Sequence, residues 1–177
     1  MTRLFSMLAA FCIATPLAAA ELSERYQVIG TITAQLGDET LNLVIPYDTE
    51  KDRAYADQSM IMGSFLTINL LGRTVEADGT PGRPMLQITL QQRGSEMDFL
   101  SAEVFDDQGF DAPLSMGLDG GAGTLVEFDL DEANRTTGRI EGQFLRLTGY
   151  TGEPRVADGA TPVSATIQWR AELAPLD

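Results

Sequence analysis

The amino-acid sequence predicts an all-β fold: one antiparallel β-sandwich of about eight or nine short strands, with a small closed β-barrel as the alternative. Apolar and polar residues alternate with a period of two along most of the chain, and Asp-Gly pairs and a Gly-rich segment separate the alternating runs. Helical periodicity is nearly absent, and only residues 48–58 are compatible with a short helix. The uneven loops favour the sandwich over the barrel.

Each alternating run predicts one strand with one face toward the core. In the first run, Val28, Gly30, Ile32, Ala34 and Leu36 are expected to share the inward face. Later runs place inward residues at 41, 43 and 45, at 66, 68 and 70, at 86, 88 and 90, at 100, 102 and 104, and at Val126, Phe128 and Leu130.

The last run, residues 163–173, alternates without exception. Its parity predicts that Trp169 points into the core and Arg170 into solvent, because a shift by one residue would expose the indole and bury an unpaired guanidinium. Between residues 140 and 147 the alternation slips, since Ile140 and Leu147 fall on opposite faces. A β-bulge, or a strand that passes from one sheet to another, explains such a slip.

Residues 1–20 have the features of a secretory signal segment. Arg3 supplies the positive charge, an apolar stretch follows, and Ala18 and Ala20 occupy the small-residue positions of a cleavage site. We therefore expect a single β domain over residues 21–177, periplasmic or secreted, with no integral membrane segment after the signal is removed.

The absence of certain residue types from the sequence restricts the reactions and metal sites that this protein can support. Without the signal segment the chain has 11 basic and 26 acidic residues, a net charge of −15, which disfavours nucleic acid as a partner. The sequence has no His, and its only Cys, Cys12, lies in the signal segment. This excludes nucleophile systems built on His or Cys and zinc sites built on nitrogen and sulfur ligands, so we expect a protein that is not an enzyme.

The stretch EFDLDEANRTTGR, residues 127–139, suggests either a calcium loop or the turn of a β-hairpin. An EF-hand loop beginning at Asp129 fails at position six, where Asn134 replaces Gly, and at position twelve, where Ile140 replaces Glu. The hairpin explains the alternation on both sides and is the preferred interpretation. Calcium is the cofactor that these acidic stretches suggest, and its candidate ligands are Asp106, Asp107, Asp111, Asp129 and Asp131.

Residues 105–123 form a second candidate region, because long loops on a rigid β scaffold collect binding residues. An acidic loop that is merely solvated is the preferred interpretation. A catalytic pair of Asp106 with Asp111 or Glu103 is a further alternative, although no spacing supports it.

Aromatic and sulfur-containing side chains supply the remaining candidates. Four aromatic residues are expected in loops, where they can contact a sugar or an apolar ligand or cap the core: Tyr47, Tyr55, Phe110 and Tyr150. Met60 and Met62 are interpreted as side chains that fill gaps in the core.

These observations favour an exported protein that acts by binding a protein, a glycan or an apolar small ligand. A β-barrel that carries an apolar or lipid ligand is one alternative. A hydrolase that depends on carboxylates is another.

Overall fold

The computed structural model describes residues 21–61, 63 and 65–176, so the predicted signal segment and Met62 lie outside the described residues. The all-β prediction is confirmed, because this part of the chain forms strands and turns and no helix. Its strands are β1 (Tyr26–Leu36), β2 (Glu39–Asp48), β3 (Arg53–Ala54), β4 (Ala56–Ile61), β5 (Phe65–Val75), β6 (Pro81–Arg93), β7 (Glu96–Phe105), β8 (Leu114–Gly117), β9 (Gly123–Leu130), β10 (Arg135–Thr148), β11 (Arg155–Val156) and β12 (Val163–Glu172).

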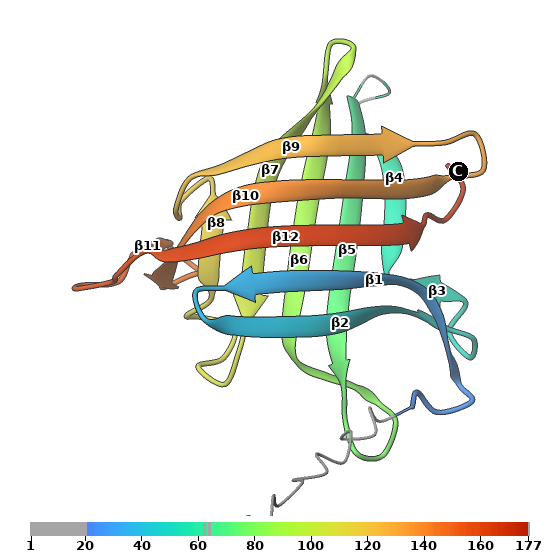
Figure 1. The fold of residues 1–177 in the computed structure, drawn as a ribbon, viewed down its shortest axis with the longest axis horizontal. Helices are drawn as coiled ribbons and strands as arrows, with labels where there is room; N and C mark the ends of the chain where they lie inside the picture. Colours follow the sequence, from blue (N-terminus) through green and yellow to red (C-terminus); the bar gives the residue numbers. More distant parts are fainter. Residues whose placement is uncertain (1–20, 62, 64, 177) are drawn as a thin grey trace, which may run out of the picture.

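Of the two predicted architectures, the closed barrel is the one that forms. Its strands follow the order β2-β1-β12-β10-β8-β7-β6-β5, and β5 returns to β2 through the pair Val44 and Arg73. The barrel is flattened into two layers whose strands cross steeply (Figure 1), with β9, β10, β12, β1 and β2 in one layer and β4 to β8 in the other. Sandwiches and flattened barrels share the same alternation, which is why the sequence pattern fits both.

The predicted slip near residue 140 marks one corner of the barrel. Residues Thr136–Gly142 of β10 pair with β9, whereas Leu145 and Arg146 pair with β8 in the other layer. The Gly-rich segment makes this corner possible, because Gly121 lies against the backbone of Gln143 with no room for a Cβ atom. These glycines therefore have a structural role.

Apolar side chains from both layers fill the barrel. Trp169 is 4% exposed and Arg170 is exposed, so the predicted register of the last strand is confirmed. The indole Nε1 donates a hydrogen bond to Thr136 Oγ1 at 3.3 Å. The largest fully buried side chains are Phe144, Ile32, Leu43, Ile45, Ile68, Leu70, Leu86, Ile88, Leu90, Met116, Ile140 and Leu147. The described residues include no helix that is both long and apolar enough to cross a membrane.

Two predicted inward positions are wrong. Val28 is 55% exposed and Val126 is 43% exposed. The pairing of β1 with β2 shifts between Val28 and Gly30, and the pairing of β10 with β9 shifts between Arg139 and Ile140, opposite Val126. A bulge adds one residue to one strand, so the parity reverses beyond it.

Other differences between prediction and structure concern secondary structure and burial rather than the direction in which a strand residue points. Residues 48–58 hold a turn, β3 and the start of β4 in place of a helix. Residues 105–123 are not one loop, because β8 lies within them, and Tyr47 belongs to β2. Met60 does not fill the core, because the ends of β4 and β5 extend past the packed interior and leave it exposed.

Candidate functional site

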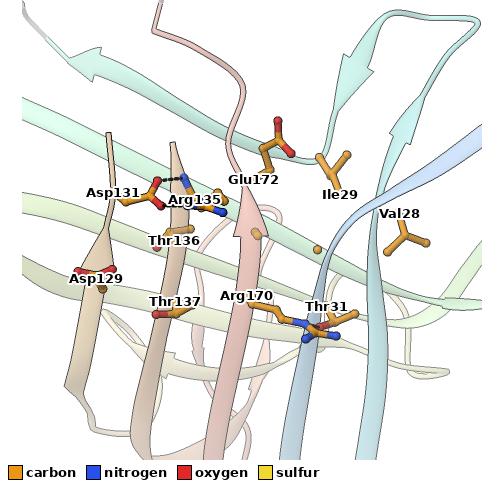
Figure 2. A pocket seen from close by; sticks show the side chains of 12 residues that line it. Val28, Ile29, Thr31, Asp129, Asp131, Arg135, Thr136, Thr137, Arg170 and Glu172 are labelled. Carbon is orange, nitrogen blue, oxygen red and sulfur yellow. Dashed lines mark hydrogen bonds and ion pairs between the residues drawn. The ribbon is translucent and has the colours of Figure 1, made fainter. Parts of the chain in front are cut away.

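A depression of about 530 Å³ lies on the outer face of β9, β10, β12 and β1 (Figure 2). Strand pairing builds its central row, since Asp129 lies beside Thr137, Thr137 beside Arg170, and Arg170 beside Thr31. Two further depressions, of about 430 and 420 Å³, share Thr137 with the first. We call this continuous surface the outer trough. Its size is within the range of small-ligand sites, although it is open to solvent.

Arg170 occupies the middle of the outer trough. Its Nε donates a hydrogen bond to Thr31 Oγ1 at 3.2 Å, and Figure 2 shows the guanidinium lying toward Thr31. Among the described residues Arg170 has no carboxylate within ion-pair distance, whereas five other arginines do: Arg25, Arg93, Arg135, Arg139 and Arg146. The terminal guanidinium nitrogens of Arg170 therefore have N–H donors available for solvent or a ligand.

Carboxylates provide the acceptors of the outer trough. Asp131 accepts hydrogen bonds from the backbone N–H and the guanidinium of Arg135, which hold the pKa of Asp131 below its usual value. Asp129 forms no side-chain hydrogen bond with another described residue, and Thr137 separates it from Arg170. Arg170, the donor, and Asp129, the acceptor, are therefore two strand spacings apart, about 10 Å along the sheet. This distance leaves room for a ligand the size of one sugar ring.

A bulge brings apolar side chains to one end of the outer trough. The consecutive residues Val28 and Ile29 both line it, Val28 as an exposed side chain and Ile29 as one that is partly buried against the core. β1 can bulge here because Gly30 lies against β12, where a Cβ atom would be 2.6 Å from the carbonyl oxygen of Arg170. Bulges commonly re-aim side chains beside binding sites. The sequence pattern missed this feature, because apolar and small residues recur at every second position from Val28 onward.

The candidate calcium ligands are dispersed. Asp129 and Asp131 line the outer trough. Asp106 pairs with Arg146 through contacts of 3.0 and 2.6 Å, and Asp111 accepts a hydrogen bond from Thr151 Oγ1 at 2.7 Å. Asp107 is exposed on a turn. Within the residues that the structure describes, no group of three or more acidic, Cys or His side chains is placed to hold a metal ion.

The four candidate aromatic residues divide between separate places. Phe110 and Tyr150 lie together around Phe105, with ring centroids 5.3 and 5.7 Å from that ring. Tyr47 donates a hydrogen bond to Asp52, and Tyr55 lies under the guanidinium of Arg53. None of the four lines the outer trough as the structure describes it.

Glu103 is a buried carboxyl group on β7, only 3% exposed. Its one side-chain hydrogen bond comes from Ser101 Oγ at a long 3.4 Å, and burial raises the pKa of Glu103 to about 7. Burial, followed by the charges of Glu103 and Asp119, also raises the pKa of Tyr150. Glu103, Asp106 and Asp111 thus have different hydrogen-bond partners, an arrangement that lends no support to a catalytic pair.

The outer trough was only partly visible in the sequence. The alternation placed Arg170 outward and the acidic stretch drew attention to Asp129 and Asp131. Their convergence with Thr31 depends on the pairing of β10 with β12 and of β12 with β1, strands that are not adjacent in sequence. Comparison with protein-family models, with curated proteins and with solved structures gives no match, so the function is inferred from the geometry of this chain alone.

Proposed function

We propose that the chain is an exported, non-enzymatic binding protein that holds a neutral glycan in the outer trough. The observation that carries this proposal is the position of Arg170, which forms no ion pair with a described carboxylate and lies between Thr31 and Thr137 in the middle of the outer trough. Arg53, Arg73, Arg83 and Arg155 also form no ion pair with another described residue, but none of them lines the outer trough. Arg170 does line it, and threonines flank its position on both neighbouring strands.

The groups of the outer trough match the chemistry of a sugar. Hydroxyl groups of a glycan both donate and accept hydrogen bonds. Arg170 offers donors, Asp129 and Glu172 offer acceptors, and the two central threonines offer both. Val28 and Ile29 supply an apolar end against which the C–H face of a sugar ring can pack.

Charge favours a neutral glycan over an acidic one. The net charge of −15 after signal removal repels anions at long range. Asp129 and Glu172 repel them within the site itself. The guanidinium of Arg170 does not offset this repulsion, and the other two arginines of the outer trough, Arg135 and Arg139, are already paired with carboxylates.

The packed interior supports an outer binding site over the carriage of an apolar ligand inside the barrel. The side chains that fill the interior come from both layers and are almost completely inaccessible to solvent. An apolar carrier instead needs a cavity that encloses most of its ligand.

A glycan array probed with the chain from Glu21 onward tests the proposal, and calorimetry on the best neutral oligosaccharide follows. We expect Arg170→Gln to weaken binding at least about tenfold, because it removes charge-assisted hydrogen bonds. Arg155→Gln, which makes the same charge change on the exposed strand β11, is the matched control and should bind like the native chain. Equal affinity of both variants, or no binding to any neutral glycan, contradicts the proposal.

A further inference from the structure

The β4–β5 hairpin ends in large apolar side chains that lie in water. Met60, Ile61 and Phe65 are 46%, 42% and 45% exposed. Figure 1 shows β4 and β5 running to the upper edge of their layer, where the β6–β7 hairpin also lies. Clustered exposed apolar residues of this kind mark interaction sites more often than isolated ones do.

Both faces of this hairpin end are apolar. Strand pairing puts Ile61 opposite Phe65 and Met60 opposite Leu66. Because successive residues of a strand point to opposite faces, Ile61 and Phe65 lie on one face and Met60 and Leu66 on the other. A flat protein surface covers only one face of such a hairpin, whereas a fluid apolar medium surrounds both.

This hairpin also lacks the charges that protect the other hairpins. Residues 58–72 contain no Asp, Glu, Lys or Arg. Each of the other tight connections between successive long strands carries or is flanked by charged residues: Asp38 after β1, Glu76 and Asp78 after β5, Arg93 and Glu96 around the β6–β7 turn, and Asp131 and Glu132 after β9. Charged residues are the usual means by which a protein keeps exposed β-structure in water.

We propose that the end of the β4–β5 hairpin inserts into the surface of a zwitterionic lipid bilayer. A second copy of the chain is a poorer occupant, because two bodies that each carry a net charge of −15 repel one another. A basic protein partner would be expected to meet unpaired acids around the contact. Residues 58–72 supply none, and on the neighbouring β6–β7 hairpin Asp98 is already paired with Arg93. A bilayer without net charge matches both the uncharged segment and its two apolar faces. The inference is independent of the glycan proposal.

Flotation with phosphatidylcholine vesicles tests the inference. We expect the chain from Glu21 onward to float with the vesicles. The combined variant Met60→Ser, Ile61→Ser, Phe65→Ser should lower the vesicle partition coefficient at least about tenfold. Phosphatidylglycerol added to the vesicles should weaken binding at low salt, because the acidic body is repelled.

The matched control changes three exposed apolar residues elsewhere on the surface, Leu118→Ser, Val126→Ser and Val156→Ser, and should bind vesicles like the native chain. Native-like emission of the buried Trp169 verifies that each variant is folded. In the variant Phe65→Trp, vesicles should shift the emission of the new indole to the blue and brominated lipid should quench it.

Several results would overturn the inference. They are no flotation of the native chain, equal loss of binding in the control variant, and stronger binding to anionic vesicles. A dimer detected by analytical ultracentrifugation that the hairpin variant abolishes, without vesicle binding, would assign the same surface to a second copy of the chain.

Discussion

The β9–β10 and β4–β5 hairpins meet water in opposite ways. At the β9–β10 turn, Asp131 accepts hydrogen bonds from two backbone N–H groups and from Arg135. Asn134 has a φ of +59° and accepts a hydrogen bond at 3.0 Å from Gln58 near the base of β4. At the other end of β4, Met60 and Ile61 are exposed, and residues 58–72 contain no charged residue.

The comparison shows that a segment rich in carboxylates is not necessarily the segment whose side chains lack partners in the folded chain. The acidic β9–β10 turn resembles a metal loop in sequence, yet its polar groups satisfy one another. The β4–β5 hairpin resembles an ordinary pair of core strands, yet its end leaves apolar surface in water. Side chains that lack partners in the folded chain are the better guide to a binding site, because a partner that covers them gains free energy.

The largest effect is expected where the core supports the β9–β10 hairpin. Trp169 lies directly beneath Gly138, against which its ring packs, and bonds Thr136. Trp169→Ala should lower the free energy of unfolding by about 3–5 kcal/mol, measured by chemical denaturation and circular dichroism. Trp169→Phe should cost less, because most of the ring volume remains. Native Trp169 emission at the wavelength of an exposed indole would contradict the assigned register.

The dependence of stability on pH tests the same difference for single carboxyl groups, because Asp131 accepts several hydrogen bonds and Glu103 accepts only one long one. The pKa of Glu103 is raised from 4.5 to about 7 in the folded chain. The folded state therefore holds the proton more tightly than the unfolded state, so stability should fall as pH rises from about 4.5 to about 7. The full loss is about 3 kcal/mol.

Denaturation at pH 5 and pH 8 measures this loss, and Glu103→Gln should remove most of the difference between the two pH values. Asp107→Asn, at an exposed position in the same part of the chain, should leave the difference unchanged. The same pH dependence in the native chain and in Glu103→Gln would show that another group is responsible.

A smaller effect is expected at Asn134, which joins the two hairpins. Asn134→Ala should cost about 2 kcal/mol, because alanine disfavours a positive φ and the largely buried Gln58 amide loses one acceptor. Asn134→Gly removes only the hydrogen bond and should cost about 1 kcal/mol. Equal losses in the two variants, measured as free energies of unfolding, would mean that the positive φ contributes nothing.

No effect is expected from calcium. Because Asp131 is already engaged by Arg135, millimolar calcium or EDTA should leave the melting temperature unchanged. The melting temperature would contradict this if it rose with calcium and if Asp129→Asn together with Asp131→Asn abolished that rise. The β9–β10 turn would then be a metal loop.

The sequence was most informative where alternation was unbroken. Along residues 163–173 burial follows parity at every core position, so Trp169 and Arg170 lie where the pattern placed them. It failed where a bulge reversed the parity, at Val28 and Val126, because a bulge is stabilised by the partner strand and not by the bulged residues themselves. It also failed at Met60, since alternation reports which way a side chain points but not whether a second layer covers it.

The sequence by itself determined the all-β class, the register of the last strand and the hairpin at residues 131–135, because side-chain periodicity and turn chemistry are local properties. Only the tertiary structure decided that the two layers close into a barrel, through the pairing of Val44 with Arg73 and of Arg146 with Leu114. It likewise decided that Thr31, Asp129, Thr137 and Arg170 share one trough. Both outcomes depend on contacts between segments far apart in the chain, and such contacts form only when the whole core is buried at once.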